Sequence, residues 1–376
     1  MLLISNEEVQ QVLTMDASIE AIEDGLKEYY RGDATCRPRS DLWSPCGQPH
    51  SYFQWGSMEG TNRRHMVFCI RMKSDIAYWE KVSEDVWTHE YYCQRPGQFC
   101  GLIMLFSLEN GEPLAIMNDG YLQHMRSGAT IGLGAKYLAL SEARTLGILG
   151  SGGMARTNAM AICTVRPIKE IKVYSPTTEH RVAYAEEMSR ALQVRVRPVE
   201  HPAEAAQDSD VVCCCTDSIV PVLKGEWLKE GAFLSSVKDT IELDDSTVER
   251  ISGFLSFAPE PISMNLKRDF GAEAGPRSHS GKYQAYIAGR SEELAKIPQA
   301  QRATTKIPRE KIFTLKDLLD GKTRGRKNNR EILSIASGGI QGIQFASVGG
   351  MVYHLVKERG LGKEIPTDWF LQTIRN

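Results

Sequence analysis

The sequence has little net charge and no long apolar run. Among its 376 residues, 45 Lys and Arg nearly balance 47 Asp and Glu, so the formal charge is -2 at pH 7. Such a balance gives no bias toward nucleic acid or an acidic membrane surface. No apolar stretch reaches membrane-spanning length, and the start "MLLISNEEVQ" lacks the regions of a secretion signal. We therefore expect a cytoplasmic protein that binds neither nucleic acid nor a membrane.

Metal-binding cysteine pairs are also lacking. The nine cysteines include no C-x-x-C pair, and three of them, Cys213 to Cys215, are consecutive in "SDVVCCCTDS". Side chains alternate between the two faces of a strand, so three consecutive cysteines cannot converge on one ion. The run instead predicts a buried parallel strand in which cysteine acts as a small apolar residue. We expect no metal site.

The most informative motif is G-x-G-x-x-A, which follows the apolar run Thr145–Leu149. In this fingerprint the first glycine permits the tight turn and the second lets the backbone approach a pyrophosphate. A helix that begins near Met154 would direct free N–H groups and the positive end of its dipole at the phosphates. Ile171–Tyr174 supplies the second strand of the βαβ unit. The predicted cofactor contacts are Gly150, Ser151, Gly152, Gly153, Met154, Ala155 and Thr216.

The second strand lacks the acidic residue with which NAD sites usually bind the ribose hydroxyls. Ser175 stands there, followed by Pro176 and Thr177, with Arg181 close behind. The hydroxyl groups and Arg181 could bind a 2′-phosphate, or the same hydroxyl groups could form an ordinary turn and helix cap. The pattern favours NADP(H) as the cofactor, with NAD(H) as the alternative.

Strands and helices alternate beyond this unit. We expect a helix over 180–192, a strand over 194–199, a short helix near Glu204, the cysteine strand and a fifth strand within 231–237. This alternation predicts an α/β fold with a doubly wound parallel sheet.

The N-terminal part predicts a different architecture. Two helices precede Gly32, the first with a capping box at Ser5 and Glu8 and the second capped by Asp16. Strands follow, and Asn110-Gly111 is a strong hairpin signal between two apolar runs. A helix over 121–140 leads into the nucleotide-binding part, and the chain is long enough for two domains.

Four basic residues outside the nucleotide-binding part are candidates for substrate binding: Arg39, Arg71, Lys73 and Arg126. An arginine fork can hold a carboxylate at two points. Arg71 and Lys73 are two apart in an expected strand, so both point to one face. Each residue alone could also be a solvated surface group.

The segments "CRPRS", "IRMKSD", "GEPLAIMNDGYLQHMRSGA" and "LGILGSGGMA", with "SDVVCCCTDSIVPVLKGEWLKEGAFLSSVKDTIELDD", resemble the ornithine cyclodeaminase/μ-crystallin family. The resemblance implies a Rossmann domain over 131–321, inserted in a substrate-binding and dimerisation domain formed by 1–130 and 322–376. It also implies that Arg39, Lys73 and Arg126 face the substrate, although a two-residue shift would exchange Lys73 for Arg71. Asp239 is the nearest match to the family's catalytic base.

Three features depart from the family pattern. Residues 78–99 and 263–308 are additions, the first expected as a hairpin or excursion, and Gln344 occupies a position where the family has Asp. We predict an NADP(H)-dependent oxidoreductase that acts on the C–N bond of an α-imino or α-amino acid, as a homodimer. Lys73 or Asp239 would handle protons, and a lysine near arginines should have a lowered pKa. The alternatives are an ammonia-releasing cyclodeaminase and a non-enzymatic NADP-binding protein.

Overall fold

The structure is a computed structural model that describes residues 1–48, 51–83, 86–218, 220–258, 284–288, 306–336 and 339–374. The chain divides into two compact units, which are described separately. Unit 1 contains Met1–Arg126, residues 284–288 and the chain from Gly339 onward, and unit 2 contains the remainder. The first boundary between them lies within helix α3 (Gly120–Leu138).

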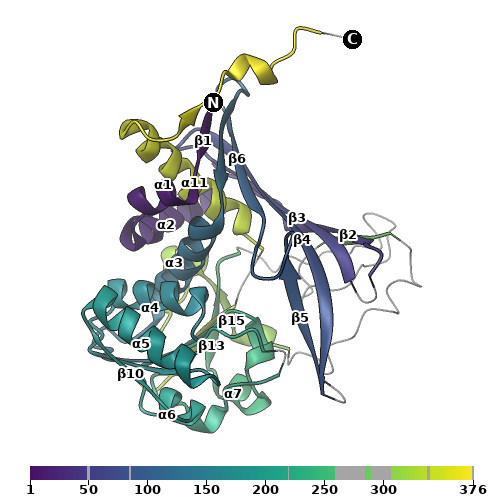
Figure 1. Cartoon of the computed structure of the whole chain (residues 1–376). Coiled ribbons are helices and arrows are strands. Elements are labelled where there is room, and N and C mark those ends of the chain that lie inside the picture. Colours follow the sequence, from purple (N-terminus) through teal and green to yellow (C-terminus); the bar gives the residue numbers. More distant parts are fainter. Residues whose placement is uncertain are drawn as a thin grey trace. The chain divides into compact units, whose positions relative to one another are not determined.

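Unit 1 is built on a mixed sheet (Figure 1), with nine strands among the described residues. Its order is β14-β2-β3-β4-β6-β7-β1-β17, and β5 pairs with β4. The pairs β1–β7 and β14–β2 are parallel, and the other pairs are antiparallel. The strands are β1 (Leu2–Ile4), β2 (Ser40–Pro45), β3 (Ser51–Asn62), β4 (Val67–Ser83), β5 (Val86–Tyr92), β6 (Gly101–Ser107), β7 (Pro113–Asn118), β14 (Gln284–Ile287) and β17 (Lys363–Glu364).

One face of this sheet is covered by α11 (Gln341–Glu358), which packs against β3, β4 and α2 (Met15–Arg31). Two glycines allow the close approach. A Cβ on Gly342 would lie 1.8 Å from the carbonyl oxygen of Glu59, and one on Gly60 would lie 2.4 Å from the carbonyl carbon of Gly342. The helix can therefore lie on β3 only because neither residue has a side chain.

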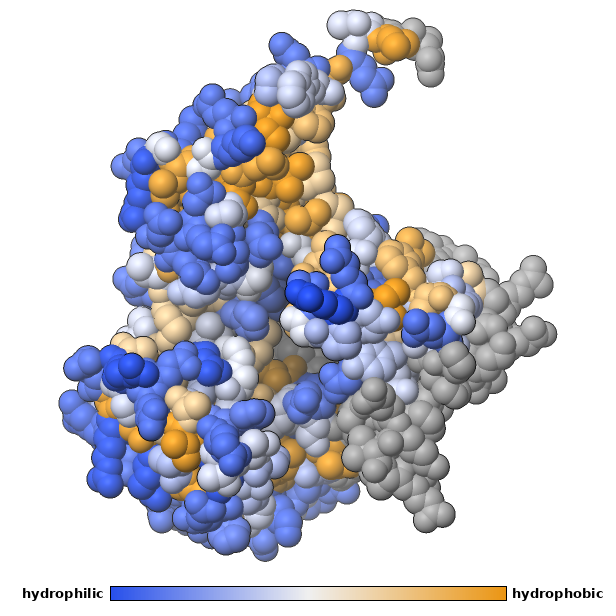
Figure 2. Space-filling model, in the orientation of Figure 1, coloured by the Kyte–Doolittle hydropathy of each residue, from blue (hydrophilic) through white to orange (hydrophobic). Residues whose placement is uncertain are grey.

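The opposite face of the sheet is apolar but only partly covered. Val67 and Cys69 of β4, and Ile103 and Leu105 of β6, point to the face under α11 and are fully buried. The apolar side chains between them point to the opposite face and are half-exposed or exposed. In Figure 2 apolar side chains gather over β1 and β6 of unit 1. The residues that point to this second face are Phe68, Ile70, Met72, Leu102, Met104, Phe106, Leu114 and Ile116.

Unit 2 is a parallel sheet with eight strands in the described part of the chain, in the order β10-β9-β8-β11-β12-β16-β13-β15. The strands are β8 (Thr145–Leu149), β9 (Glu170–Tyr174), β10 (Arg195–Pro198), β11 (Val211–Cys214), β12 (Phe233–Ser236), β13 (Gly253–Ser256), β15 (Ile312–Thr314) and β16 (Leu333–Ala336). The helices include α4 (Gly153–Val165), α5 (Thr178–Leu192), α6 (Pro202–Ala206), α7 (Asp245–Arg250) and α10 (Leu315–Leu319). The first five strands follow the doubly wound order, as predicted.

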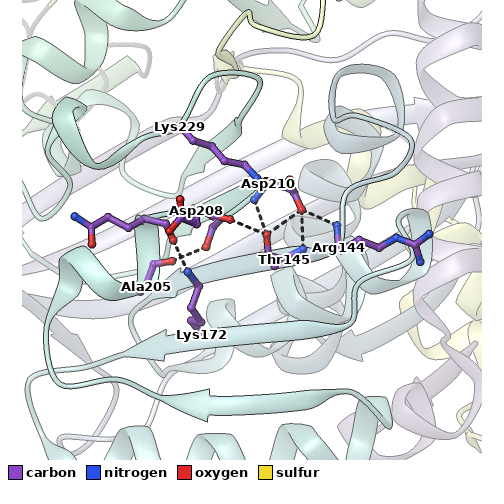
Figure 3. Close-up of polar contacts among 9 residues, drawn as sticks. Arg144, Thr145, Lys172, Ala205, Asp208, Asp210 and Lys229 are labelled. Carbon is purple, nitrogen blue, oxygen red and sulfur yellow. Dashed lines mark hydrogen bonds and ion pairs between the residues drawn. The ribbon is translucent and has the colours of Figure 1, made fainter.

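A polar cluster fixes the amino ends of β8 and β11 (Figure 3). The Asp210 carboxylate accepts hydrogen bonds from the backbone N–H groups of Arg144 (2.7 Å) and Thr145 (2.9 Å). It also accepts from the Thr145 hydroxyl (2.9 Å) and the Lys229 ammonium (2.6 Å). Ligands of doubly wound sheets bind at the carboxyl ends of the strands. This cluster lies at the amino ends, so its role is to stabilise the fold.

The local predictions agree with the structure in most places. The capping box at Ser5 and Glu8 is formed at α1 (Asn6–Val12), the Asn110-Gly111 turn joins β6 and β7, and β4 pairs antiparallel with β5 within the stretch expected as a hairpin. The predicted cap of α2 was wrong, because Thr14 is the N-cap and Asp16 lies in the first turn.

Two strands depart from the predicted division into domains. β16, expected in the 322–376 segment of the outer domain, pairs with β12 and β13 in unit 2. β14, expected within 131–321, pairs with β2 in unit 1. Strand order in a sheet is set by long-range packing, which no local pattern reports. Of the predicted addition 263–308, only 284–288 and 306–308 lie within the described residues.

Candidate active site

The fingerprint loop of unit 2 has the backbone geometry that a dinucleotide needs. Gly150 has φ +106°, and a Cβ there would lie 2.3 Å from the carbonyl oxygen of Cys215, so only glycine fits. A Cβ on Gly152 would meet nothing within 4 Å, which leaves space beside the backbone. Gly152 is also the N-cap of α4 and supplies no side-chain cap for its N–H groups. The loop therefore leaves space beside the backbone, and the first N–H groups of α4 have the arrangement with which helix N-termini bind phosphate groups.

The loop after β9 holds the residues predicted to bind the adenosine ribose. Ser175 is buried, and Thr177 is the N-cap of α5 without a side-chain cap hydrogen bond. Arg181 is buried beneath this loop and donates from Nη1 to the carbonyl oxygens of Ser175 (3.0 Å) and Pro176 (3.4 Å). Its Nη2 pairs with Glu200 at 2.5 Å, a partner that the sequence pattern did not reveal.

Thr216 belongs to a buried network that the sequence reasoning missed. The fully buried Glu242 carboxylate accepts from the backbone N–H and the hydroxyl of Thr216, at 2.8 and 2.7 Å. It also accepts from the Ser236 hydroxyl at 2.6 Å and the Lys238 backbone N–H at 3.1 Å. Glu242 thus fixes the loops that leave the carboxyl ends of β11 and β12. The only sequence signal was an acidic residue between two apolar ones. Asp239 lies in the 3-10 turn Asp239–Glu242, and its side chain lies outside the described part of the structure.

In unit 1, three of the four predicted basic residues meet on the face of the sheet that α11 packs against. Arg39 Nε donates to Asp41 Oδ1 at 2.7 Å, and Lys73 Nζ lies 2.7 Å from Asp75 Oδ2. A Cβ on Gly56 would lie 2.7 Å from Asp41 Oδ1, 3.1 Å from Lys73 Cγ and 3.2 Å from Arg39 Nη2. These side chains therefore converge over Gly56, where β3 lacks a side chain.

Arg71 is the third member of this group. Its Nε and Nη2 lie 2.6 and 2.5 Å from Asp119 Oδ2. A Cβ on Gly101, which is opposite Lys73 in the sheet, would lie 2.0–2.2 Å from the Asp119 carboxylate. Asp119 therefore lies over Gly101, beside Lys73, and holds the Arg71 guanidinium in a buried ion pair.

Arg126 of α3 joins the group through Phe345 of α11. The Arg126 and Arg71 guanidinium carbons lie 4.7 and 5.5 Å from the centroid of this buried ring. Gln344 Oε1 accepts from Arg126 Nη1 at 2.8 Å, and Gln123 Oε1 accepts from Nη2 at 2.8 Å. Gln344, at the position where the family pattern has Asp, thus orients the arginine with a neutral amide.

The lysine of this cluster has a perturbed ionisation. Burial is the main cause that lowers the pKa of Lys73 to about 8, and the positive charge of Arg39 lowers it further. Asp75 opposes this shift, and Arg71 adds a smaller lowering. The Lys73 ammonium also lies 4.1 Å from the centroid of the Tyr91 ring. A group with this pKa can give or take a proton near neutral pH.

Groups of His, Cys, Asp and Glu that could hold a metal ion are absent from the described residues. Cys213 and Cys214 are buried in β11, and Cys215, just after it, is also buried. No described helix is long and apolar enough to cross a membrane.

Comparison with known proteins decides the family. A family model described as the ornithine cyclodeaminase/mu-crystallin family matches residues 96–360. The chain belongs to this family. The resemblance stated from the sequence motifs is therefore confirmed.

Individual members agree with this placement and with the predicted α/β fold. A Delta(1)-pyrroline-2-carboxylate reductase of Bacillus cereus is 28% identical over 273 residues, or 70% of this chain and 74% of that one. An alanine dehydrogenase of Archaeoglobus fulgidus is 28% identical over 246 residues, covering 63% and 66%. The structure of Thermococcus litoralis Delta(1)-pyrroline-2-carboxylate reductase in complex with NADH and L-proline has a TM-score of 0.72 at 26% identity. It covers 97% of this chain and 100% of that chain.

Proposed function

We propose that this member of the ornithine cyclodeaminase/mu-crystallin family is a reductase of an α-imino acid that uses a nicotinamide dinucleotide, with NADP(H) favoured. In reverse it would be an amino acid dehydrogenase. The observation that carries the proposal is the largely buried cluster of Arg39, Arg71 and Lys73, joined by Arg126. Its arginine forks suit a carboxylate, and its lysine suits proton transfer at neutral pH. The relatives named above, two reductases and a dehydrogenase, support the same class of reaction.

Each residue of the cluster has a role in this proposal. Arg126 and Arg39 hold the substrate carboxylate, and the Arg71–Asp119 pair keeps Arg71 in place beside them. Lys73 Nζ gives a proton to the imine nitrogen during reduction and takes it back during oxidation, with Asp239 as the alternative proton carrier. Asp75 Oδ1 is buried and has no hydrogen-bond partner among the described residues, so it can accept an N–H of the substrate.

A dinucleotide bound to unit 2 would supply the hydride for the α-carbon. Unit 2 would bind it through the 150–155 loop and the N–H groups of α4. Thr216, fixed by Glu242, would form the further contact predicted at the end of β11.

A stoichiometry measurement separates this activity from the alternatives. With an imino acid and NADPH, we expect one NADPH oxidised for each amino acid formed and no ammonia released. Ammonia release from a diamino acid without net change of cofactor would instead identify a cyclodeaminase. Nucleotide binding without turnover of any imino acid would favour a non-enzymatic binding protein. The neutral Gln344, where the family pattern has Asp, argues against ornithine chemistry.

The cofactor proposal predicts that NADPH binds more tightly than NADH. The strand β9 is itself followed by Ser175 and not by the acidic residue that would repel a 2′-phosphate. Ser175→Asp should lower the ratio of NADPH to NADH affinity by about tenfold or more, since it restores that charge. Fluorescence titration of both nucleotides with both proteins measures the ratio. Equal or reversed affinity in the wild-type protein would contradict the proposal.

We also propose a homodimer that covers the apolar second face of the unit 1 sheet. The half-exposed Ile70 of β4 lies on this face, and a second copy related by a two-fold axis could bury it. Ile70→Glu should shift the protein from dimer to monomer, as measured by light scattering at micromolar concentration. Leu319→Glu, at an exposed apolar position of α10 in unit 2, is the matched control and should leave the dimer intact. A wild-type monomer would contradict the proposal.

A further inference from the structure

An ion pair in unit 2 joins Arg181 of α5 to Glu200, which follows the carboxyl end of β10. The Arg181 guanidinium is buried, with its side chain 5% exposed, whereas the Glu200 side chain is 73% exposed. Glu200 follows Val199, whose N–H donates to the carbonyl oxygen of Val173 at 2.9 Å, so Glu200 lies beside the end of β9. Arg181 is therefore a buried cation, and its partner Glu200 is exposed to solvent.

The hydrogen bonds of Arg181 show which of its nitrogens hold the loop and which binds Glu200. Nη1 donates to the carbonyl oxygens of the loop at Ser175 and Pro176, and Nη2 donates to the Glu200 carboxylate. Nε is buried and makes no hydrogen bond within the described part of the chain. Moving the exposed Glu200 side chain into solvent would therefore open Nη2 without disturbing the bonds that hold the loop.

This end of the second strand is where a Rossmann domain distinguishes a ribose 2′-hydroxyl from a 2′-phosphate. A carboxylate there accepts hydrogen bonds from the ribose hydroxyl groups and repels the phosphate, whereas an arginine fork binds the phosphate oxygens. In this chain the strand itself ends in Ser175, but Glu200 brings a carboxylate from the neighbouring strand to the same place.

We propose that Glu200, through its ion pair with Arg181, sets the selectivity between the two forms of the dinucleotide. With the 2′-hydroxyl form, Glu200 stays on Arg181 and its exposed oxygen accepts from the ribose. With the 2′-phosphate form, the phosphate displaces Glu200 and takes Nη2 of Arg181. Glu200 thus weakens NADPH binding and moderates the preference that Ser175 creates. This inference rests on the proposed dinucleotide binding.

The test is a titration of NADPH and NADH against wild-type protein, Glu200→Gln and Glu230→Gln. Glu230 pairs with Arg330 at 2.8 Å and precedes the amino end of β12, so Glu230→Gln removes the same charge far from the ribose end of the sheet. Glu200→Gln should raise the ratio of NADPH to NADH affinity by about tenfold, because the phosphate no longer competes with a carboxylate. Glu230→Gln should leave the ratio unchanged.

Two fragments then locate the effect. Glu200→Gln should tighten the binding of 2′-AMP and leave that of 5′-AMP near the wild-type value. An unchanged NADPH to NADH ratio in Glu200→Gln, or equal tightening of both fragments, would overturn the proposal for Glu200 while leaving the proposed function intact. Failure of the wild-type protein to bind either dinucleotide would overturn both. Melting curves of the three proteins confirm that the comparison is made between folded molecules.

Discussion

Arg126→Ala is expected to lower kcat/KM for the imino acid by about 30-fold or more, which corresponds to roughly 2–5 kcal/mol of lost transition-state binding. The Arg126 guanidinium lies against Phe345 and is oriented by the side-chain amides of Gln123 and Gln344. We expect its loss to remove a charge-assisted contact with the substrate carboxylate. NADPH affinity should stay near the wild-type value, because the contact is with substrate.

Two variants test this explanation. Arg126→Lys should recover little activity, because an ammonium cannot reproduce the two-point geometry of a guanidinium. Arg37→Ala removes a more exposed arginine of unit 1 that pairs with Glu59, and it should leave kcat/KM nearly unchanged. If Arg126→Ala lowers the melting temperature but the folded protein turns over normally, Arg126 is a structural residue and its assignment to the substrate fails.

Lys73→Gln is expected to lower kcat for imine reduction by roughly 10²–10⁴-fold, the usual contribution of a general acid. Lys73 is largely buried beside Asp75 and Tyr91, so the amide of the replacement can occupy the site without introducing a charge. The affinity for NADPH should change little. If Lys73→Gln keeps a kcat close to the wild-type value, Lys73 is not the proton donor, and Asp239 or solvent has that role.

The pH dependence gives an independent test of Lys73. Its pKa is lowered to about 8, chiefly by burial, so the ammonium form is lost as the pH rises through that value. The rate of imine reduction should therefore fall above about pH 8, and the rate of amino acid oxidation should rise. Because Asp75 raises the pKa of Lys73, Asp75→Asn should move this limb to lower pH. If the pH at which the rate falls is the same in Asp75→Asn as in the wild-type protein, a group other than Lys73 titrates.

Local sequence patterns were sufficient for the backbone geometry of the 150–155 loop and for most elements. The turn at Gly150 and the alternation of strands and helices depend on neighbours in the sequence, and the structure contains both. The direction of the Lys73 pKa shift was also predictable, because two arginines were expected nearby. Period-two alternation placed Arg71 and Lys73 on one face, as the sheet register bears out.

Long-range partners could not be predicted in this way. The Arg181–Glu200 ion pair depends on how β10 lies beside β9, and the Arg126–Gln344 hydrogen bond joins residues 218 positions apart. β16 enters the sheet of unit 2 between two strands that precede it in sequence, so no local signal marks its place. The four acceptor contacts of Glu242 likewise come from three separate residues and require the folded sheet.

The most direct test of the central claim follows the hydride itself. The protein is incubated with an α-imino acid and NADPH that carries deuterium at C4 of the nicotinamide, on each face in turn. Mass spectrometry of the amino acid product should show one deuterium at the α-carbon with one of the two labelled faces and none with the other. No deuterium in the product with either face, while product forms, would contradict the assignment of this chain as a nicotinamide-dependent imino acid reductase.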